Sequence, residues 1–454
     1  MWANYCFDGG YEEIFIPSID YICDPSEPRQ KVGSKIFKGT IESKDAIFYF
    51  KDSRINGGAT GDKEGLKYLS AVYIAFRLDL HLYVWNDGAG ANIKEGMISL
   101  NRAGEGFMFN ALVGEKASLD KWNLWIQNHY DNRLKELIQK LNAFFRFIAT
   151  PNGYSFIVAV GVGSSTGLDV YGSSQAAIQI LLDEEESYRV LTGSQVIRSV
   201  TGENLTNYEI GGAQVMGSET GTADLIARDK IHLLYSIHRI QEIFSKTVAQ
   251  KKNKLSSQLE ILSMPETNVD WRKNFFHQEE FLEFKQEYLN TENLSAGFGK
   301  LFGQSIFYAR FSNQLYERTE PLIRLKELHL TAEKTSSHEL FIFDKSANHS
   351  EFNRSSRWIN AKLDLESSLG KKNVFRIHIL LSPDSLKDHP FHSSADILIF
   401  VSSEITPEEN MWVDKTVGIV VPTLEEALGV SRKLFSLITN RSVQVDEREK
   451  DDSE

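Results

Sequence analysis

Residues 81–90 read HLYVWNDGAG, an apolar run that leads directly into a loop of small residues. An apolar run that ends at an Asn-Asp-Gly turn is typical of a buried strand. Just upstream, the spacing of apolar residues within 63–78 predicts a helix with one face formed by Leu66, Leu69, Tyr73 and Phe76. A helix followed by a buried strand and a glycine-rich loop indicates an α/β fold.

The same alternation continues on both sides of this stretch. Apolar runs at 36–41 and 47–50 predict two short strands, and the glycine-rich turn NGGATG follows them at residues 56–61. Further along, a second buried strand is expected at 154–160, and it runs into the small-residue stretch GVGSSTG at 161–167. Helical periodicity predicts long helices over 118–148 and 229–262.

A polar stretch at 263–280, which contains Pro265, separates this region from a second set of predicted strands at 341–344, 374–381 and 395–400. The order of elements roughly repeats that of the first half, which is a weak internal repeat of pattern rather than of residues. We therefore predict an N-terminal extension (1–31), a first domain (32–265), a second domain (266–442) and a charged tail (443–454). A chain of 454 residues is long enough for two domains of roughly 200 residues each.

Composition narrows the class of protein. The net charge is −12, and no basic stripe is present that would attract a phosphate backbone, so nucleic acid is not expected as a partner. No run of about 18 apolar residues predicts a membrane span, and the first residues lack the pattern of a secretory signal. The two cysteines, Cys6 and Cys23, do not form a Cys-x-x-Cys pair, which is consistent with a reducing compartment. We expect a cytoplasmic protein that has no membrane partner.

Two loops of small residues, at 87–96 and 161–171, each follow a predicted strand directly. Small residues allow the backbone to turn sharply and allow a ligand to approach the peptide N–H groups. Two such N–H groups aimed at one point form an oxyanion hole, which stabilises a thioester enolate as charge moves onto its oxygen. For either loop alone, the simpler interpretation is that its glycines merely form turns. Two such loops in this order favour a role in binding an oxyanion.

Several motifs occur in a fixed order along the chain, namely NGGATG (56–61), DGAGANIKEG (87–96), LTGSQVI (191–197), VTGE (200–203), EIGGA (209–213) and GTAD (221–224). Over residues 39–225 they resemble the N-terminal half of the carboxyltransferase subunits of biotin-dependent acyl-CoA carboxylases, of the propionyl-CoA carboxylase type. The stretch 87–96 also resembles the oxyanion loop of crotonases, and residues 281–288 and 297–303 resemble the start of the family's second half.

The resemblance implies a fold of two tandem crotonase-like domains, each a ββα superhelix. It implies transfer of a carboxyl group from carboxybiotin to the α-carbon of an acyl-CoA, at a site that spans two subunits of a homo- or hetero-oligomer. Biotin would arrive on a separate biotin carboxyl carrier and be loaded by a biotin carboxylase, because this chain contains no Met-Lys-Met motif and no phosphate-binding Gly-x-x-x-x-Gly-Lys loop. No metal is expected in this chain.

Carried over position by position, the resemblance assigns the site to backbone groups. The catalytic positions are Gly167, Leu168, Ala89 and Gly90. The positions expected to contact the cofactor are Gly57, Gly58, Gly88 and Ala91.

The sequence departs from the family pattern most in its second half. In the first half, Asn92 replaces an arginine and Leu168 replaces a glycine. In the second, KSA at 345–347 replaces Pro-Gly-Phe, and SPDSL at 382–386 replaces a Gly-Gly-Ala turn, which puts a second oxyanion hole in doubt. Two alternatives stay open: a non-catalytic paralogue that serves as a structural partner in a carboxylase complex, and a crotonase-type acyl-CoA decarboxylase.

Three histidines are assigned no functional role. His378 lies in an apolar run and is expected to be a core residue. His389 and His392 lack a third ligand at metal-binding spacing, so no metal site is predicted there.

Overall fold

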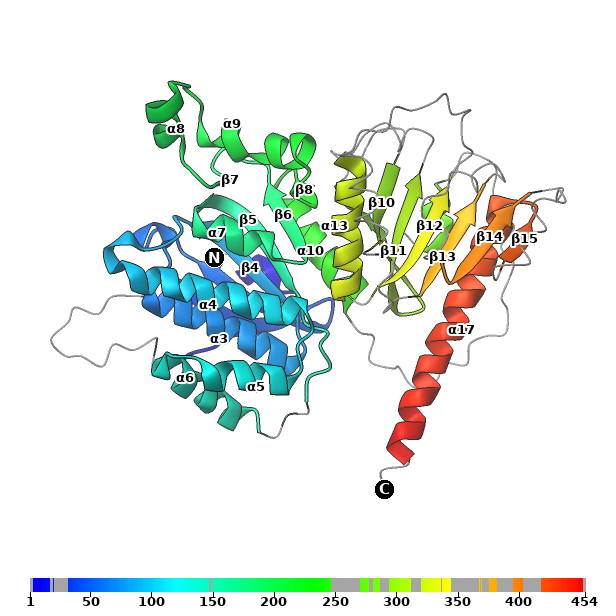
Figure 1. Cartoon of the computed structure of the whole chain (residues 1–454), viewed down its shortest axis with the longest axis horizontal. Coiled ribbons are helices and arrows are strands. Elements are labelled where there is room, and N and C mark those ends of the chain that lie inside the picture. The colour runs from blue at the N-terminus through cyan, green and yellow to red at the C-terminus, as the bar shows by residue number, and fades with distance from the viewer. Residues whose placement is uncertain are drawn as a thin grey trace. The chain divides into compact units, whose positions relative to one another are not determined.

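Two compact units, Met1–Glu242 and Ile243–Glu454, make up the computed structural model of the chain (Figure 1). The structure describes residues 3–16, 19, 32–146, 148, 150–245, 270–276, 281–285, 294–311, 320–335, 337–343, 367, 369, 375–381, 395–402 and 418–451. The predicted domain boundary between residues 265 and 266 lies outside these ranges and stays a prediction.

The first unit is built on one mixed sheet. Its strands run in the order β1-β2-β3-β4-β5-β6-β8, and β7 pairs with β5. The strands from β1 to β3 pair antiparallel, and the pairs from β3 onward are parallel. Their bounds are β1 Tyr11–Glu13, β2 Ser34–Ile41, β3 Lys44–Lys51, β4 Leu82–Gly88, β5 Ile157–Thr166, β6 Ile178–Leu182, β7 Tyr188–Val190 and β8 Leu225–Ala227.

Helices and single turns connect these strands. The helices are α1 Ala3–Cys6, α3 Asp62–Leu78, α4 Met97–Gly114, α5 Leu119–Asn128, α6 Asn132–Phe144, α7 Leu168–Ser174, α8 Ser194–Thr201, α9 Asn207–Gly211 and α10 Lys230–Phe244. The short turns are η1 Asn56–Gly58, η2 Ile93–Glu95 and η3 Val215–Glu219. Helix α3 packs on β2, β3 and β4, α4 packs on α3, and α7 contacts both α4 and β5. The predicted apolar face of the helix at 63–78 is confirmed, because all four of its residues are buried.

Two predicted elements differ from the structure. The predicted helix over 118–148 is two helices, α5 and α6, because Asp131 caps a new helix start by accepting a hydrogen bond from the backbone N–H of Arg133 (2.8 Å). The predicted strand at 154–160 continues to Thr166 as β5, because its last residues pair with β7. The loop after β5 therefore begins only at Gly167.

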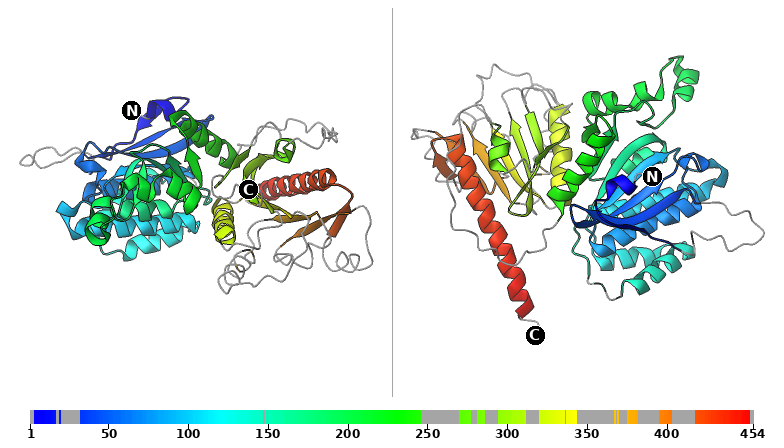
Figure 2. Two further views of the ribbon diagram at one scale, coloured as in Figure 1. Left: turned by 90° about the horizontal axis from the view of Figure 1, so that it is seen from above. Right: turned by 180° about the vertical axis from the view of Figure 1, so that it is seen from behind.

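The second unit repeats this plan. Its sheet order is β15-β14-β13-β12-β11-β10-β9, antiparallel from β9 to β11 and parallel from β11 to β15. The bounds are β9 Phe281–Glu283, β10 Leu294–Leu301, β11 Gln304–Phe311, β12 His338–Phe343, β13 Arg376–Leu380, β14 Ile397–Val401, β15 Gly418–Val421, α11 Trp271–Phe275, α13 Glu320–Thr335 and α17 Leu424–Asp451. Helix α17 extends well past the edge of this sheet (Figure 2). The predicted α/β class and the internal repeat are confirmed.

A buried ionic network ties α13 to the middle of the second sheet. The carboxylate of Glu339 on β12 lies 2.5 Å from Nδ1 of His329 on α13, and it accepts a hydrogen bond from Nε of Arg376 on β13 (2.5 Å). Arg376 also donates to the carbonyl oxygen of Leu369 (2.8 Å), and the three ionic side chains are buried. His378, expected in the core, is fully buried with its ring beside that of Phe341.

We predict that Glu339→Ala lowers the free energy of unfolding of the second unit by about 3–5 kcal/mol, because it leaves the buried Arg376 without its carboxylate. Urea unfolding followed by hydrogen exchange in β12 and β13 would measure the change. In the matched control, Glu425→Ala at the exposed start of α17, we expect a loss below about 1 kcal/mol. Equal effects of the two substitutions would contradict the prediction.

Candidate active site

The candidate site lies where three parallel strands of the first sheet end. Strands β3, β4 and β5 end at Lys51, Gly88 and Thr166, and parallel pairing brings these ends to one edge. In open α/β sheets, ligands bind outside the carboxyl ends of the strands. Both loops that the sequence singled out, and the glycine-rich turn, start from this edge.

The glycine-rich turn packs against the loop after β4 through backbone contacts. The N–H of Ala89 donates to the carbonyl oxygen of Gly57 (3.0 Å), and the N–H of Thr60 donates to that of Gly90 (2.6 Å). A Cβ atom at Gly58 would lie 2.2 Å from the carbonyl oxygen of Asp87, and one at Gly88 would lie 2.4 Å from that of Gly58. Only glycine allows two main chains to approach so closely.

This packing brings the predicted cofactor-contacting residues together. Ala91 forms a parallel bridge with Thr60, which places it beside Gly57, Gly58 and Gly88. The close backbone approach accounts for the glycines at 58 and 88 without any ligand. The cofactor-contacting role of these four residues stays a prediction.

The loop after β5 meets the loop after β4. Gly167 has a φ of +56° and donates its N–H to the carbonyl oxygen of Val190 (3.0 Å). Leu168 then begins α7. A Cβ atom at Gly90 (φ +78°) would lie 2.5 Å from the carbonyl oxygen of Thr166 and 3.3 Å from the backbone nitrogen of Leu168. The backbones of Gly90 and Leu168 are therefore immediate neighbours.

The four predicted catalytic N–H groups divide into two kinds. Those of Ala89 and Gly167 are used inside the chain, where they hold the loops in place. Those of Gly90 and Leu168 have no acceptor among the described residues. Gly90 is a buried residue, and an unpaired N–H in such a residue is uncommon in folded proteins. Each of the two loops therefore carries one N–H group that has no acceptor among the described residues, and the two residues that carry these groups are neighbours.

A buried ion pair that the sequence did not predict lies beneath these loops. Nζ of Lys51 lies 2.6 and 2.7 Å from the two carboxylate oxygens of Asp169, and it donates to Oγ1 of Thr60 (2.8 Å). The Lys51 and Asp169 side chains are only 7% and 9% exposed. The two residues are 118 positions apart, and no local pattern in the sequence links them.

A cavity of about 70 Å³ lies against the same ion pair. It is bounded by β3–β5 and by α3, α4 and α7, and its lining includes Tyr49, Tyr68, Phe107, Leu168 and Asp169. Burial raises the pKa of the Tyr49 and Tyr68 hydroxyls above the usual value, so both stay neutral. They donate to the carbonyl oxygen of Glu64 (3.2 Å) and to Oδ1 of Asn110 (2.7 Å). Neither phenol is therefore a candidate base.

The block 191–213, which contains three of the motifs noted in the sequence, follows β7 and forms the short helices α8 and α9. Thr206 and Glu209 make a reciprocal capping box at the start of α9. Oδ1 of Asn207 accepts the N–H of Ser194 (2.7 Å), which joins α8 to α9. A Cβ atom at Gly211 would lie 2.1 Å from the carbonyl oxygen of Arg189, so this glycine allows α9 to lie against β7.

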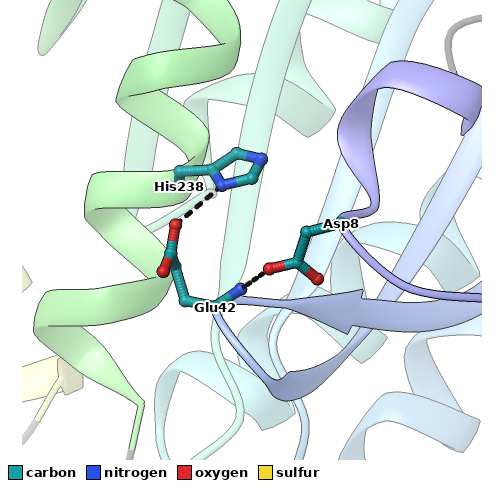
Figure 3. Close-up of side chains that lie close together, drawn as sticks. All are labelled: Asp8, Glu42 and His238. Atoms are coloured by element: carbon teal, nitrogen blue, oxygen red, sulfur yellow. Dashed lines mark hydrogen bonds and ion pairs between the residues drawn. The ribbon is translucent and has the colours of Figure 1, made fainter.

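One group of possible metal ligands occurs among the described residues: Asp8, Glu42 and His238 (Figure 3). Nδ1 of His238 lies 3.0 Å from a carboxylate oxygen of Glu42, and Asp8 accepts the backbone N–H of Glu42 (2.5 Å). The backbone N–H of Asp8 also donates to the carbonyl oxygen of Thr40 (3.1 Å). Glu42 lies in the turn between β2 and β3, at the opposite end of β3 from Lys51, so the group is separate from the candidate site. The expectation of no metal stays a prediction.

Several predicted features fall outside the described residues. These are Cys23, the altered segments 345–347 and 382–386, and His389 and His392. Cys6 is a buried free thiol, and burial raises its pKa to about 12. In the part of the chain that the structure describes, no helix is long and apolar enough to cross a membrane.

Comparison with known proteins supports the resemblance seen in the sequence. Residues 136–307 match the carboxyl transferase domain family. Over 189 residues, 42% of this chain, it is 27% identical to the biotin-dependent acetyl-/propionyl-coenzyme A carboxylase beta5 subunit of Mycobacterium tuberculosis. Over 290 residues, 59% of this chain, it is 21% identical to the propionyl-CoA carboxylase beta chain of Saccharopolyspora erythraea. The matched regions cover 27% and 46% of those relatives.

The fold agrees over a longer span. The crystal structure of transcarboxylase 12S, a hexamer solved with methylmalonyl-coenzyme A and methylmalonic acid bound, matches 96% of this chain and 89% of its own with a TM-score of 0.70. At 16% identity, this likeness establishes the fold alone. The predicted tandem crotonase-like fold is thereby confirmed. The chain therefore contains a region, residues 136–307, that matches the carboxyl transferase domain, and its fold is similar to that of transcarboxylase 12S.

Proposed function

We propose that this chain is the carboxyltransferase component of a biotin-dependent acyl-CoA carboxylase, acting on a short acyl-CoA. The observation that carries the proposal is the pair of adjacent, unused N–H groups of Gly90 and Leu168 at the ends of β4 and β5. The carboxyl transferase match covers β5 and α7, which supply one of the two donors.

In this proposal, both N–H groups donate to the thioester carbonyl oxygen of the acyl-CoA. As the α-proton leaves, negative charge moves onto that oxygen, and fixed donors stabilise it without reorganisation. The new bond from the enolate carbon to the carboxyl carbon would form as the bond from that carboxyl carbon to the biotin ureido nitrogen breaks, and the α-proton would end on that nitrogen. Ala89 and Gly167 act indirectly, since their N–H groups hold the two loops in register.

Carboxybiotin, when bound, would supply the carboxyl group. The family resemblance implies that backbone N–H groups hold its ureido oxygen, and the altered segments that put a second oxyanion hole in doubt lie outside the described residues. We propose that biotin arrives on a biotin carboxyl carrier loaded by a biotin carboxylase, that the active form is an oligomer, and that it works in the cytoplasm. The sequence supports the separate carrier, since it contains no Met-Lys-Met motif.

We predict that Leu168→Pro lowers kcat for carboxyl transfer by about 10²–10³-fold, because proline removes one oxyanion donor. Leu168 is the first residue of α7, a position that tolerates proline, so the fold should persist. Carboxylation of acetyl-, propionyl- and butyryl-CoA would be followed with free biotin and a biotin carboxylase. Leu168→Ala keeps the N–H and is the matched control.

The wild-type protein tests the proposal against its alternatives in the same assay. CoA esters that bind without carboxyl transfer would favour a non-catalytic paralogue. Release of CO₂ from methylmalonyl-CoA in the absence of biotin would favour a decarboxylase. Equal kcat values for Leu168→Pro and Leu168→Ala would rule out the Leu168 N–H as a donor.

We also predict that Gly90→Ala lowers kcat by at least about 10²-fold. The added Cβ would lie 2.5 Å from the carbonyl oxygen of Thr166 and would force the two loops apart. Ala at Gly104 on α4, where a Cβ meets nothing within 4 Å, is the control and should leave kcat unchanged. The same carboxylation assay measures both, and a Gly90→Ala enzyme of normal kcat would contradict the prediction.

A further inference from the structure

Lys51 lies where the three segments of the candidate site meet. Its ammonium group contacts the carboxylate of Asp169, the second residue of α7, and the hydroxyl of Thr60 in the glycine-rich region. The backbone of Thr60 in turn pairs with the loop after β4, since it donates to Gly90 (2.6 Å) and accepts from Asn92 (2.9 Å). One cation thus connects the Gly90 loop to the helix that begins at Leu168.

The surroundings make this connection rigid. A Cβ atom at Gly88 would lie 2.7 Å from Oδ2 of Asp169, so the carboxylate rests directly on the end of β4. Oγ of Ser99 on α4 donates to the carbonyl oxygen of Thr60 (2.6 Å), which fixes that residue from the other side. Because both charges are nearly excluded from water, removing either one leaves the other buried and unpaired.

The two proposed donors belong to separate loops, and no hydrogen bond between the backbones of Gly90 and Leu168 is found in the described residues. Pairing of β4 with β5 up to Gly88 and Ser165 holds the two loops side by side, and side-chain contacts that reach both loops set the finer spacing of the donors. The chain of contacts from Gly90 through Thr60, Lys51 and Asp169 to Leu168 provides such a path. An oxyanion hole needs its donors held within about 0.5 Å, and an error near 1 Å can cost about 10²-fold in rate.

We propose that Lys51 is a positioning residue that sets the spacing between the N–H groups of Gly90 and Leu168. The inference rests on the proposed function, in which both N–H groups donate to the same atom, the thioester oxygen. Lys51 does not touch the substrate; it acts through Thr60 and Asp169. Its removal weakens stabilisation of the enolate more than binding of the CoA ester.

The first test is Lys51→Met, which keeps the aliphatic stem and removes the charge. We expect kcat for carboxyl transfer to fall about 10²-fold while KM for the acyl-CoA changes less than about threefold. Lys121→Met is the matched control, because Lys121 forms an ion pair with Glu115 on the surface of the same unit, where the two side chains are 55% and 59% exposed. A folded Lys51→Met enzyme with normal kcat would overturn the proposal.

The double variant Lys51→Met/Asp169→Leu guards against failure of the single variant to fold, since it leaves no unpaired buried charge. It should show the same loss of kcat as Lys51→Met. Circular dichroism and thermal melting would establish that each variant is folded. If the double variant kept the kcat of the wild-type protein, that result would overturn the positioning role, as it would for Lys51→Met alone.

Infrared spectra of ¹³C-labelled acyl-CoA bound to the protein give a readout that does not need turnover. Two donors on the carbonyl oxygen lower its stretching frequency, and we expect Lys51→Met to reverse part of that shift while Lys121→Met does not. A shift in the wild type that persists in Lys51→Met overturns the Lys51 inference alone. If the carbonyl stretching frequency does not shift in the wild-type protein, the two N–H groups are not donors to the thioester oxygen, and the role of Lys51 fails as well.

Discussion

The close approach of three main-chain segments at one edge of the first sheet is the constraint on which the site depends. A carbonyl oxygen of a neighbouring segment lies where a Cβ atom would otherwise be at three positions: Gly58, Gly88 and Gly90. Because side chains are excluded there, the loops meet through their backbones. We therefore propose that peptide N–H groups, rather than side-chain acids or bases, contact the substrate at this edge.

Two buried ionic contacts of the chain, one in each unit, have different surroundings. In the first, the buried Lys51–Asp169 pair lies at the strand ends, directly under the loops that carry the candidate donors. In the second, the Glu339 network lies among β12, β13 and α13, inside the core. A buried charge is retained only when its partner is fixed in place. The first pair therefore constrains a site, and the second constrains the packing of a helix on a sheet.

The sequence predicted what depends on local pattern and missed what depends on distant contacts. The apolar face of α3 and the strand at 82–85 follow from residue spacing alone. The stretch 161–166 is rich in Gly and Ser, and its pairing with β4, β6 and β7 makes it a strand. Likewise, the motifs located both loops, but they did not show which of Ala89 and Gly90 has an N–H group without an acceptor. That depends on a distant contact, because the carbonyl oxygen of Gly57 in the glycine-rich turn accepts the N–H of Ala89.

The replacement of a glycine by Leu168 is explained by the same geometry. Gly90 has a positive φ, and an added Cβ there would strike Thr166; Gly167, at φ +56°, has a backbone that an L residue rarely adopts. Leu168 instead has the backbone of a first helical residue, which any side chain permits. Since the N–H does not depend on the side chain, this position can diverge in sequence without loss of its donor. A motif that departs from the family pattern is therefore compatible with the two donors that we propose.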